Sequence, residues 1–246
     1  MRPASPPEKH ADDLYRTGAG PGRFEFNQAV ARVFDDMLER SVPLYRECLS
    51  ATVGWAARYA RPGSRVYDLG CSTGSLAAAL ANALPGGVHL VGVDNSPAML
   101  EKAREKLQGR CTGWELIEAD LAGNFRPTDA SVVVLNYTLQ FLPPHRRGEL
   151  LKKIHQGMRD GGLLLLIEKI TAENPEYDET LTALYHDYKR ERGYTELEIA
   201  RKRDALENVL IPMPPAENRT LIAGAGFRAV ELFFRWNNFA GFVALK

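Results

Sequence analysis

The sequence has few cysteines, no excess of charge of either sign and no long apolar run, and each shortage excludes a class of protein. Its three cysteines, Cys48, Cys71 and Cys111, are far apart and lack metal-ligand spacing, so neither a disulfide framework nor a zinc site is predicted. Lys+Arg and Asp+Glu both number 31, so no net field draws the chain to nucleic acid or to a membrane surface. No run approaches the ~18 apolar residues of a membrane span.

The N-terminal residues lack the apolar core of a secretory signal peptide. Residues 1–22 are instead rich in proline, glycine and charged residues. We therefore expect a cytoplasmic protein that neither binds nucleic acid directly nor enters a membrane. Residues 1–23 are predicted to be a flexible tail. Residues 24–246, a length that suits one large α/β domain, are predicted to form a single domain.

Strand and helix patterns alternate through most of this domain. Two helices are predicted first, within residues 24–60, because apolar residues recur at a helical period from 26 to 40 and Pro43 opens a second run to 59. Alternation implies parallel strands joined by crossovers, whereas the β-rich runs 226–234 and 238–245 form a hairpin that makes the last strand antiparallel. We predict an α/β fold with a doubly wound, mostly parallel seven-stranded sheet of the Rossmann-like type. The other strands are expected near residues 64–69, 88–93, 114–118, 131–136 and 162–168, and further helices near 73–84, 96–108 and 144–159.

Residues 170–212 interrupt the alternation with a charged helical insertion. An insertion between core elements of an α/β domain usually covers the active site or makes an oligomer contact, and both roles stay open. Just before it, Gly161 and Gly162 are expected to end a helix and precede the next strand.

The segment 65–74, RVYDLGCSTG, joins the first strand to a small-residue helix and carries the clearest functional signal. A dinucleotide-binding loop reads G-x-G-x-x-G, because its middle glycine admits a pyrophosphate. Here only Gly70 and Gly74 are present, and the carboxylate of Asp68 at the strand end would repel a phosphate. The loop therefore suits a ligand with an adenosine end, a cationic amino group and no phosphate. S-adenosylmethionine (SAM) is such a ligand, and D-L-G-x-x-x-G resembles the first motif of SAM-dependent methyltransferases.

Acidic residues end the next two strands and predict the rest of a nucleoside site. Asp94 can accept hydrogen bonds from both ribose hydroxyls; its alternative role, capping the next helix, is already filled by Ser96 before Pro97. Asp120 can accept a hydrogen bond from the adenine amino group, with Leu121 packed against the adenine ring. The alternative is that Asp120 is simply an exposed aspartate in a turn.

The fourth strand turns polar at Asn136, which places an amide beside the reacting end of the ligand. Tyr-Thr-Leu follows it, whereas enzymes that methylate base amines usually carry Pro-Pro and an aromatic residue there, so that activity is disfavoured. Cys71 lies inside the glycine turn with no histidine near it in sequence, so it is expected to be a small turn residue rather than a nucleophile. The histidines show no metal-ligand spacing, and no metal is predicted.

Six longer segments of the sequence are more specific to one protein family than the glycine turn is. They are 41–45 (SVPLY), 66–72 (VYDLGCS), 94–99 (DNSPAM), 135–142 (LNYTLQFL), 186–190 (HDYKR) and 196–203 (ELEIARKR). With these segments the chain, from about Phe26 to Lys246, resembles the carboxy-S-adenosyl-L-methionine (carboxy-SAM) synthases of the class I SAM-dependent methyltransferase superfamily. The departures are mild: Tyr137 and Tyr188 stand where that family would have phenylalanine.

The resemblance implies an enzyme that uses SAM and prephenate. The ring carboxyl group of prephenate moves to the SAM methyl carbon, phenylpyruvate and water are released, and carboxy-SAM is the bound product. A partner enzyme then uses this carboxymethyl donor to modify wobble uridine in tRNA. The resemblance also implies a homodimer and leaves open whether Arg203 acts within its own subunit or from the neighbouring one. The implied ligand contacts are Tyr45, Gly70, Cys71, Ser72, Asp94, Asn95, Asp120, Leu121, Asn136 and Arg203.

Charge supports this interpretation of Arg203. A methyltransferase has no use for a guanidinium beside the positive sulfur of SAM, but a carboxylate on the methyl carbon can be bound by Arg203 in a bidentate pair, with Tyr45 donating a further hydrogen bond. Arg203 and Tyr45 are thus the candidate catalytic residues. No side chain is an evident base for the methyl proton, so the substrate is expected to supply one. The alternatives are a conventional SAM-dependent methyltransferase acting on tRNA or a small molecule, and a catalytically silent SAM-binding module.

Overall fold

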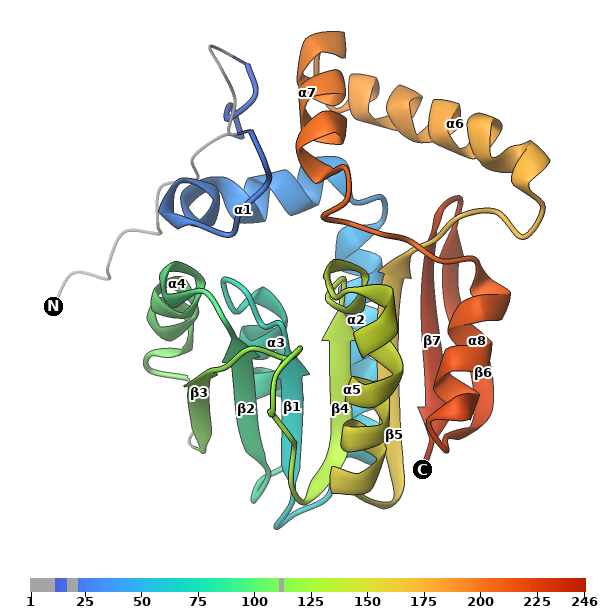
Figure 1. Ribbon diagram of the computed structural model, residues 1–246. Helices are drawn as coiled ribbons and strands as arrows, with labels where there is room; N and C mark the ends of the chain where they lie inside the picture. The colour runs from blue at the N-terminus through green and yellow to red at the C-terminus, as the bar shows by residue number, and fades with distance from the viewer. Residues whose placement is uncertain (1–11, 17–21, 111–112) are drawn as a thin grey trace, which may run out of the picture.

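A seven-stranded sheet forms the centre of the molecule (Figure 1). The computed structural model describes residues 12–16, 22–110 and 113–246. The strand order is β3-β2-β1-β4-β5-β7-β6, in which β1 to β5 pair in parallel and β7 runs antiparallel to both of its neighbours. The predicted mostly parallel sheet with an antiparallel last strand is therefore confirmed. Its strands are β1 (Arg65–Leu69), β2 (His89–Asp94), β3 (Trp114–Glu118), β4 (Ala130–Asn136), β5 (Met158–Lys169), β6 (Arg228–Trp236) and β7 (Phe239–Leu245).

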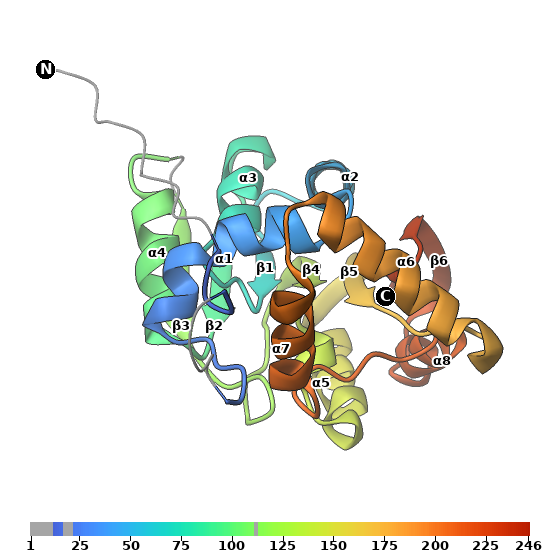
Figure 2. The same ribbon diagram turned by 90° about the horizontal axis from the view of Figure 1, so that it is seen from above.

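Helices cover both faces of this sheet and one of its ends. One face packs against α2 (Tyr45–Tyr59), α3 (Ser75–Ala83) and α4 (Pro97–Leu107), and the other against α5 (Pro144–Gly157) and α8 (Pro215–Gly224). Above the carboxyl ends of the parallel strands lie α1 (Gln28–Ser41), α6 (Asp178–Glu191) and α7 (Glu196–Leu206), as Figures 1 and 2 show. Two short 3-10 helices are η1 (Leu139–Phe141) and η2 (Pro175–Tyr177).

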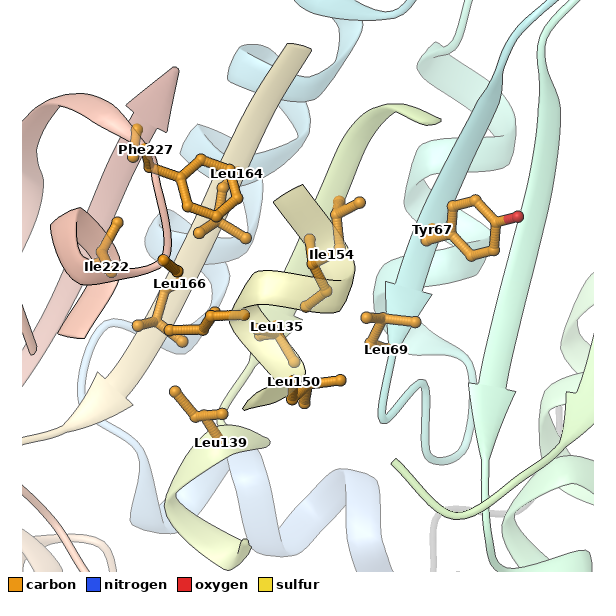
Figure 3. Close-up of a cluster of buried hydrophobic side chains, with 14 of the residues drawn as sticks. Tyr67, Leu69, Leu135, Leu139, Leu150, Ile154, Leu164, Leu166, Ile222 and Phe227 are labelled. Carbon is orange, nitrogen blue, oxygen red and sulfur yellow. The ribbon is translucent and has the colours of Figure 1, made fainter. Parts of the chain in front are cut away.

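The two-residue period of the strands divides the core into two clusters. In β4, Val134 faces the cluster beneath α2 and α3, whereas its neighbour Leu135 faces the cluster beneath α5 and α8. Figure 3 shows the second cluster, in which Leu135 lies among Leu150 of α5, Leu166 of β5 and Ile222 of α8. Burial on both faces explains why β4 and residues 163–167 of β5 are almost continuously apolar in sequence.

Local sequence fixes where several of these helices begin. The Asn27 side chain accepts a hydrogen bond from the Val30 backbone N–H at the start of α1 (3.1 Å). Ser96 does the same for α4, with Pro97 in its first turn, as the sequence predicted. Thr195 and Glu198 form a reciprocal capping box that begins α7.

The sequence-based prediction of a flexible tail over residues 1–23 is wrong for residues 12–16. Asp12 and Tyr15 are each 3% exposed. The Asp12 carboxylate accepts a hydrogen bond from the Tyr194 hydroxyl (2.6 Å) and lies 3.7 Å from the Lys202 ammonium, while Arg201 donates to the Tyr15 carbonyl (3.1 Å). These polar contacts hold the segment against Tyr194 and α7. No hydrophobic pattern in the sequence predicts them. Residues 1–11 and 17–21 lie outside the described residues.

Two further details differ from the prediction. Gly161 and Gly162 do not end α5, which stops at Gly157; they lie within β5, where the pairing with β4 shifts register between Ala130 and Val132. This irregularity accommodates the glycines in the strand. Helix α8 was not predicted, although Pro215 at its first position is a helix-start signal.

Candidate active site

A cavity of about 980 Å³ lies between the carboxyl ends of the strands and the helices above them. This is where ligands bind in open α/β sheets. The insertion covers it, since residues of α6 and α7 line the cavity together with residues of α1 and of the strand ends. All of the residues that the sequence analysis assigned to the site line it, namely Tyr45, Asp68, Gly70, Cys71, Ser72, Asp94, Asn95, Asp120, Leu121, Asn136 and Arg203.

The glycine turn after β1 forms the middle of the cavity floor. The backbone N–H groups of Gly70 and Cys71 both donate to the Val93 carbonyl (2.7 and 2.9 Å), which ties the turn to β2. Gly70 has φ +77°, and a Cβ atom there would lie 2.4 Å from the Thr138 side chain. Only glycine fits this position, so the turn can approach a ligand closely.

Asp68, at the end of β1, carries an unpartnered oxygen in this floor. Among the described residues its Oδ2 has no hydrogen-bond partner, although the side chain is only 1% exposed. Burial, and then the charge of Asp94, raise the pKa of Asp68 to about 7. A buried carboxylate of this kind is stabilised by a cation, and an ammonium group brought into the cavity would supply one.

Asp94, at the end of β2, already holds the turn in place. Its Oδ2 accepts from the Ser72 backbone N–H and its Oδ1 from that of Ser96, both at 2.9 Å. Burial raises the pKa of Asp94, and these two hydrogen bonds oppose that effect. Each oxygen keeps a further lone pair, so the carboxylate can accept from a pair of hydroxyls without losing its bonds to the loop.

The remaining predicted residues divide between the two ends of the cavity. Asp120 accepts from the Ala122 backbone N–H (2.8 Å), so it is a turn aspartate that also faces the cavity, with the buried Leu121 beside it. Burial, and then the charges of Asp68 and Asp94, raise the pKa of Cys71 well above its usual value, which keeps the thiol protonated and unsuited to nucleophilic attack. Burial likewise raises the pKa of Tyr45, which keeps its hydroxyl a hydrogen-bond donor.

The sequence analysis missed a group of lysines in the same cavity. Lys169 closes β5, Lys189 lies on α6 and Lys202 on α7, and the last two are each 5% exposed. Burial lowers the pKa of all three, to about 8 for Lys202. The signal in the sequence was Lys169 itself, a cation two residues after the apolar run 163–167, at the sheet edge where the ligand-binding groups of other strands lie.

Arg203 lies at the rim of the cavity rather than deep inside it. Its side chain is 66% exposed in this single chain, and its guanidinium donates to Asp204 (3.0 Å). Arg203 and the three lysines give this end of the cavity a positive charge. Burial, followed by the charges of Lys189, Arg190, Lys169 and Arg203, lowers the pKa of His186. The opposite end, near Asp120, has no lysine or arginine among the described lining residues.

Within the described part of the chain, no three His, Cys, Asp or Glu side chains are grouped so that they could hold a metal ion. None of the helices described is long and apolar enough to cross a membrane.

Comparison with known proteins agrees with this geometry. The methyltransferase domain family matches residues 66–162, which include the glycine turn. The carboxy-S-adenosyl-L-methionine synthase of Methylococcus capsulatus is 45% identical over 96% of this chain and 99% of its own length. The chain belongs to the carboxy-SAM synthase family. The synthases of Trichodesmium erythraeum and Desulfotalea psychrophila, 45% and 42% identical, each match 96% of this chain as well, and 93% and 97% of their own lengths.

Solved structures show how far the carboxy-SAM synthase fold is shared. An O-methyltransferase family protein from Burkholderia thailandensis aligns with a TM-score of 0.64 at 20% identity, covering 90% of this chain and 63% of its own. PigF, solved with SAH, aligns with a TM-score of 0.62 at 19% identity over 97% of this chain and 63% of its own. The Rossmann-like methyltransferase fold is thus confirmed, and the chain is a SAM-using transferase.

Proposed function

We propose that this enzyme converts SAM and prephenate into carboxy-SAM and phenylpyruvate. The observation that carries the proposal is the positive charge at one end of a SAM-type cavity. Methyl transfer from SAM needs no cation near the sulfonium, because the sulfur is already positive and like charges repel. A reaction that creates a carboxylate on the methyl carbon needs one.

The order of the strands sets the direction of SAM in the cavity. Asp120, Asp94, Asp68 and Asn136 follow β3, β2, β1 and β4, which are neighbours in that order along the sheet edge. In the proposed complex Asp120 and Leu121 contact adenine, Asp94 and Asn95 the ribose, and Asp68 the ammonium group. The methyl group then points toward β4 and β5, where Asn136 and the cations lie.

The chain's own residues then act mainly by orientation and charge. The turn from Gly70 to Ser72 positions the sulfonium, Tyr45 donates a hydrogen bond to the new carboxylate, and Arg203 binds that carboxylate at the rim. The ring C–C bond of prephenate breaks to give carbon dioxide, and the ring hydroxyl leaves as the ring becomes aromatic. The methyl proton ends in the water formed with that hydroxyl, and the methyl carbon forms its new bond to carbon dioxide. The substrate thus supplies the base, so no side chain has to.

A two-substrate assay tests this function. With SAM and prephenate, we expect SAM consumption and phenylpyruvate release in equal amounts, and a product heavier than SAM by about 44 mass units, one carbon dioxide. With SAM alone, neither bulk tRNA nor small nucleophiles should be methylated, because in the proposed reaction the methyl carbon stays on the sulfur and receives a carboxyl group. Methylated tRNA formed in the absence of prephenate would instead identify a conventional methyltransferase.

Arg203→Ala should weaken retention of carboxy-SAM while leaving the affinity for SAM unchanged. The loss is expected to be about tenfold, because a hydrogen-bonded charge is worth about 1.5 kcal/mol or more and the exposed guanidinium keeps part of its hydration. Calorimetric titration of both ligands measures the difference. Arg219→Ala, on the exposed face of α8 and outside the residues that line the cavity, is the control. Equal carboxy-SAM affinity in wild type and Arg203→Ala would remove Arg203 from the site.

Membership of the family also extends the proposal to the protein's partners. We infer a cytoplasmic homodimer whose product passes to a separate enzyme that transfers the carboxymethyl group to wobble uridine of tRNA. The chain itself contacts only small molecules in this scheme, as its balanced charge supports.

A further inference from the structure

Two of the cavity lysines lack a direct anionic partner among the described residues, although the charge of Asp12 acts on Lys189 from a distance. Neither Lys169 nor Lys189 forms an ion pair within 4.0 Å or a side-chain hydrogen bond with any residue in the described ranges. Both side chains instead lie against an aromatic ring: the two Nζ atoms are 4.9 and 4.7 Å from the centre of the Tyr185 ring. Lys202 differs from them, because its Nζ lies 3.7 Å from the buried carboxylate of Asp12.

Burial makes this arrangement costly unless an anion enters the cavity. Lys189 is 5% exposed, and burial, followed by the charges of Lys202 and Lys169, lowers its pKa despite the opposing charge of Asp12. Buried cations are normally paired, and an unpaired one loses hydration without compensation. Both side chains line the cavity, so a carboxylate there can satisfy both at once.

The position of the two lysines distinguishes this anion from SAM. Lys169 ends β5, the strand beyond β4 in the sheet order, and Asn136 of β4 pairs with Ile167 of β5. The site therefore lies past the methyl end of SAM as oriented above, on the side opposite to Asp120. It is also separate from Arg203, which is exposed at the rim whereas Lys189 is buried.

We propose that Lys169 and Lys189 bind one carboxylate of the second substrate, the one that is not transferred to SAM. The two lysines lie on either side of the β5–α6 junction and contact Tyr185. The inference rests on the proposed function, in which one carboxylate moves to the methyl carbon and the other stays on the α-keto acid product. A site that binds the retained carboxylate keeps the ring of the second substrate near the SAM methyl group throughout the reaction. The Tyr185 hydroxyl donates a hydrogen bond to the Ser41 carbonyl (2.8 Å), which holds the Tyr185 ring between α1 and the two lysines.

The test uses Lys169→Gln and Lys189→Gln in the full chain, with Lys152→Gln on the exposed face of α5 as the matched control. We expect each cavity variant to lower kcat/KM for prephenate at least tenfold, mainly through KM, with the dissociation constant of SAM changed less than twofold. The inhibition constant of phenylpyruvate should rise in parallel, because this product keeps the carboxylate in question. The melting temperature should not fall, since glutamine removes a buried charge and retains most of the side-chain volume.

The possible results test the lysine site and the proposed function separately. If wild type forms carboxy-SAM but both variants keep their kcat/KM, the lysine site is wrong and the function stands. If SAM affinity falls in step with kcat/KM, the lysines bind the carboxylate of SAM instead. If KM rises but phenylpyruvate inhibition does not change, they hold the transferred carboxylate, which also contradicts the assignment. If wild type does not convert prephenate, the proposed function fails and the lysine site falls with it.

Discussion

Between pH 8 and pH 6 the affinity of the enzyme for SAM is expected to fall about tenfold, and by pH 5 about 100-fold. Asp68 has a pKa of about 7 in the ligand-free cavity, whereas it must be a carboxylate to pair with the ammonium group of SAM. Below pH 7 binding therefore requires release of a proton, so the apparent affinity follows the deprotonated fraction and falls about tenfold for each pH unit. Above pH 7 the carboxylate is already charged and the affinity levels off. Calorimetric titration across this range measures the effect.

Asp68→Asn separates this effect from other causes. The amide cannot titrate, so the variant should bind SAM more weakly at pH 8 and show little change down to pH 6. Asp94, whose pKa burial also raises, is retained in this variant and would account for any step that remains at lower pH. Circular dichroism at each pH checks that the fold is intact. A wild-type affinity that is the same at pH 8 and pH 5.5 would exclude Asp68 as the ammonium partner.

Gly74→Ala is expected to destabilise the protein by about 2–5 kcal/mol. Gly74 precedes α3 with φ +77°, and a Cβ atom there would lie 2.8 Å from the backbone Cα of Ala103 on α4. The left-handed conformation costs an alanine about 1–2 kcal/mol, and forcing the two helices apart costs about 1–3 kcal/mol more. For a chain of this length the melting temperature should fall by about 5–15 °C. Calorimetric or fluorescence-monitored melting gives the value.

Gly86→Ala provides the control for this substitution. Gly86 lies in the turn between α3 and β2, and nothing described lies within 4 Å of the Cβ atom that alanine would add. Its melting temperature should stay within about 2 °C of wild type, since a substitution in an open turn changes stability little. A similar fall in both variants would show that neither the left-handed φ of Gly74 nor its contact with α4 explains the loss of stability.

The ends of the parallel strands were predictable from the sequence because a polar residue marks the end of each apolar run. A buried strand reads as an apolar run, and the first polar residue after it must lie at the sheet edge where ligands bind. Asp68, Asp94 and Asn136 all follow this rule, and all three line the cavity. The glycine turn was predictable for the same local reason, since its spacing is a property of consecutive residues.

The lysine pair and the N-terminal contacts were not predictable in this way, because they depend on residues far apart in the chain. Lys169 and Lys189 come together only when α6 folds back over β5, and no local pattern fixes that angle. Asp12 is buried by Tyr194 and Lys202, which lie more than 180 residues later. A charged residue in a segment rich in proline and glycine is normally solvated, so the sequence alone favours a flexible tail.

The division of the cavity between two parts of the chain bears on how such enzymes diverge. The groups proposed to bind the adenosyl part follow β1 to β4, whereas the cations come from the end of β5 and from α6 and α7. Substitution within the insertion can therefore change the second substrate while the SAM turn stays intact. The solved methyltransferases that align with this chain at 18–20% identity share its fold, and a shared fold can carry different chemistries.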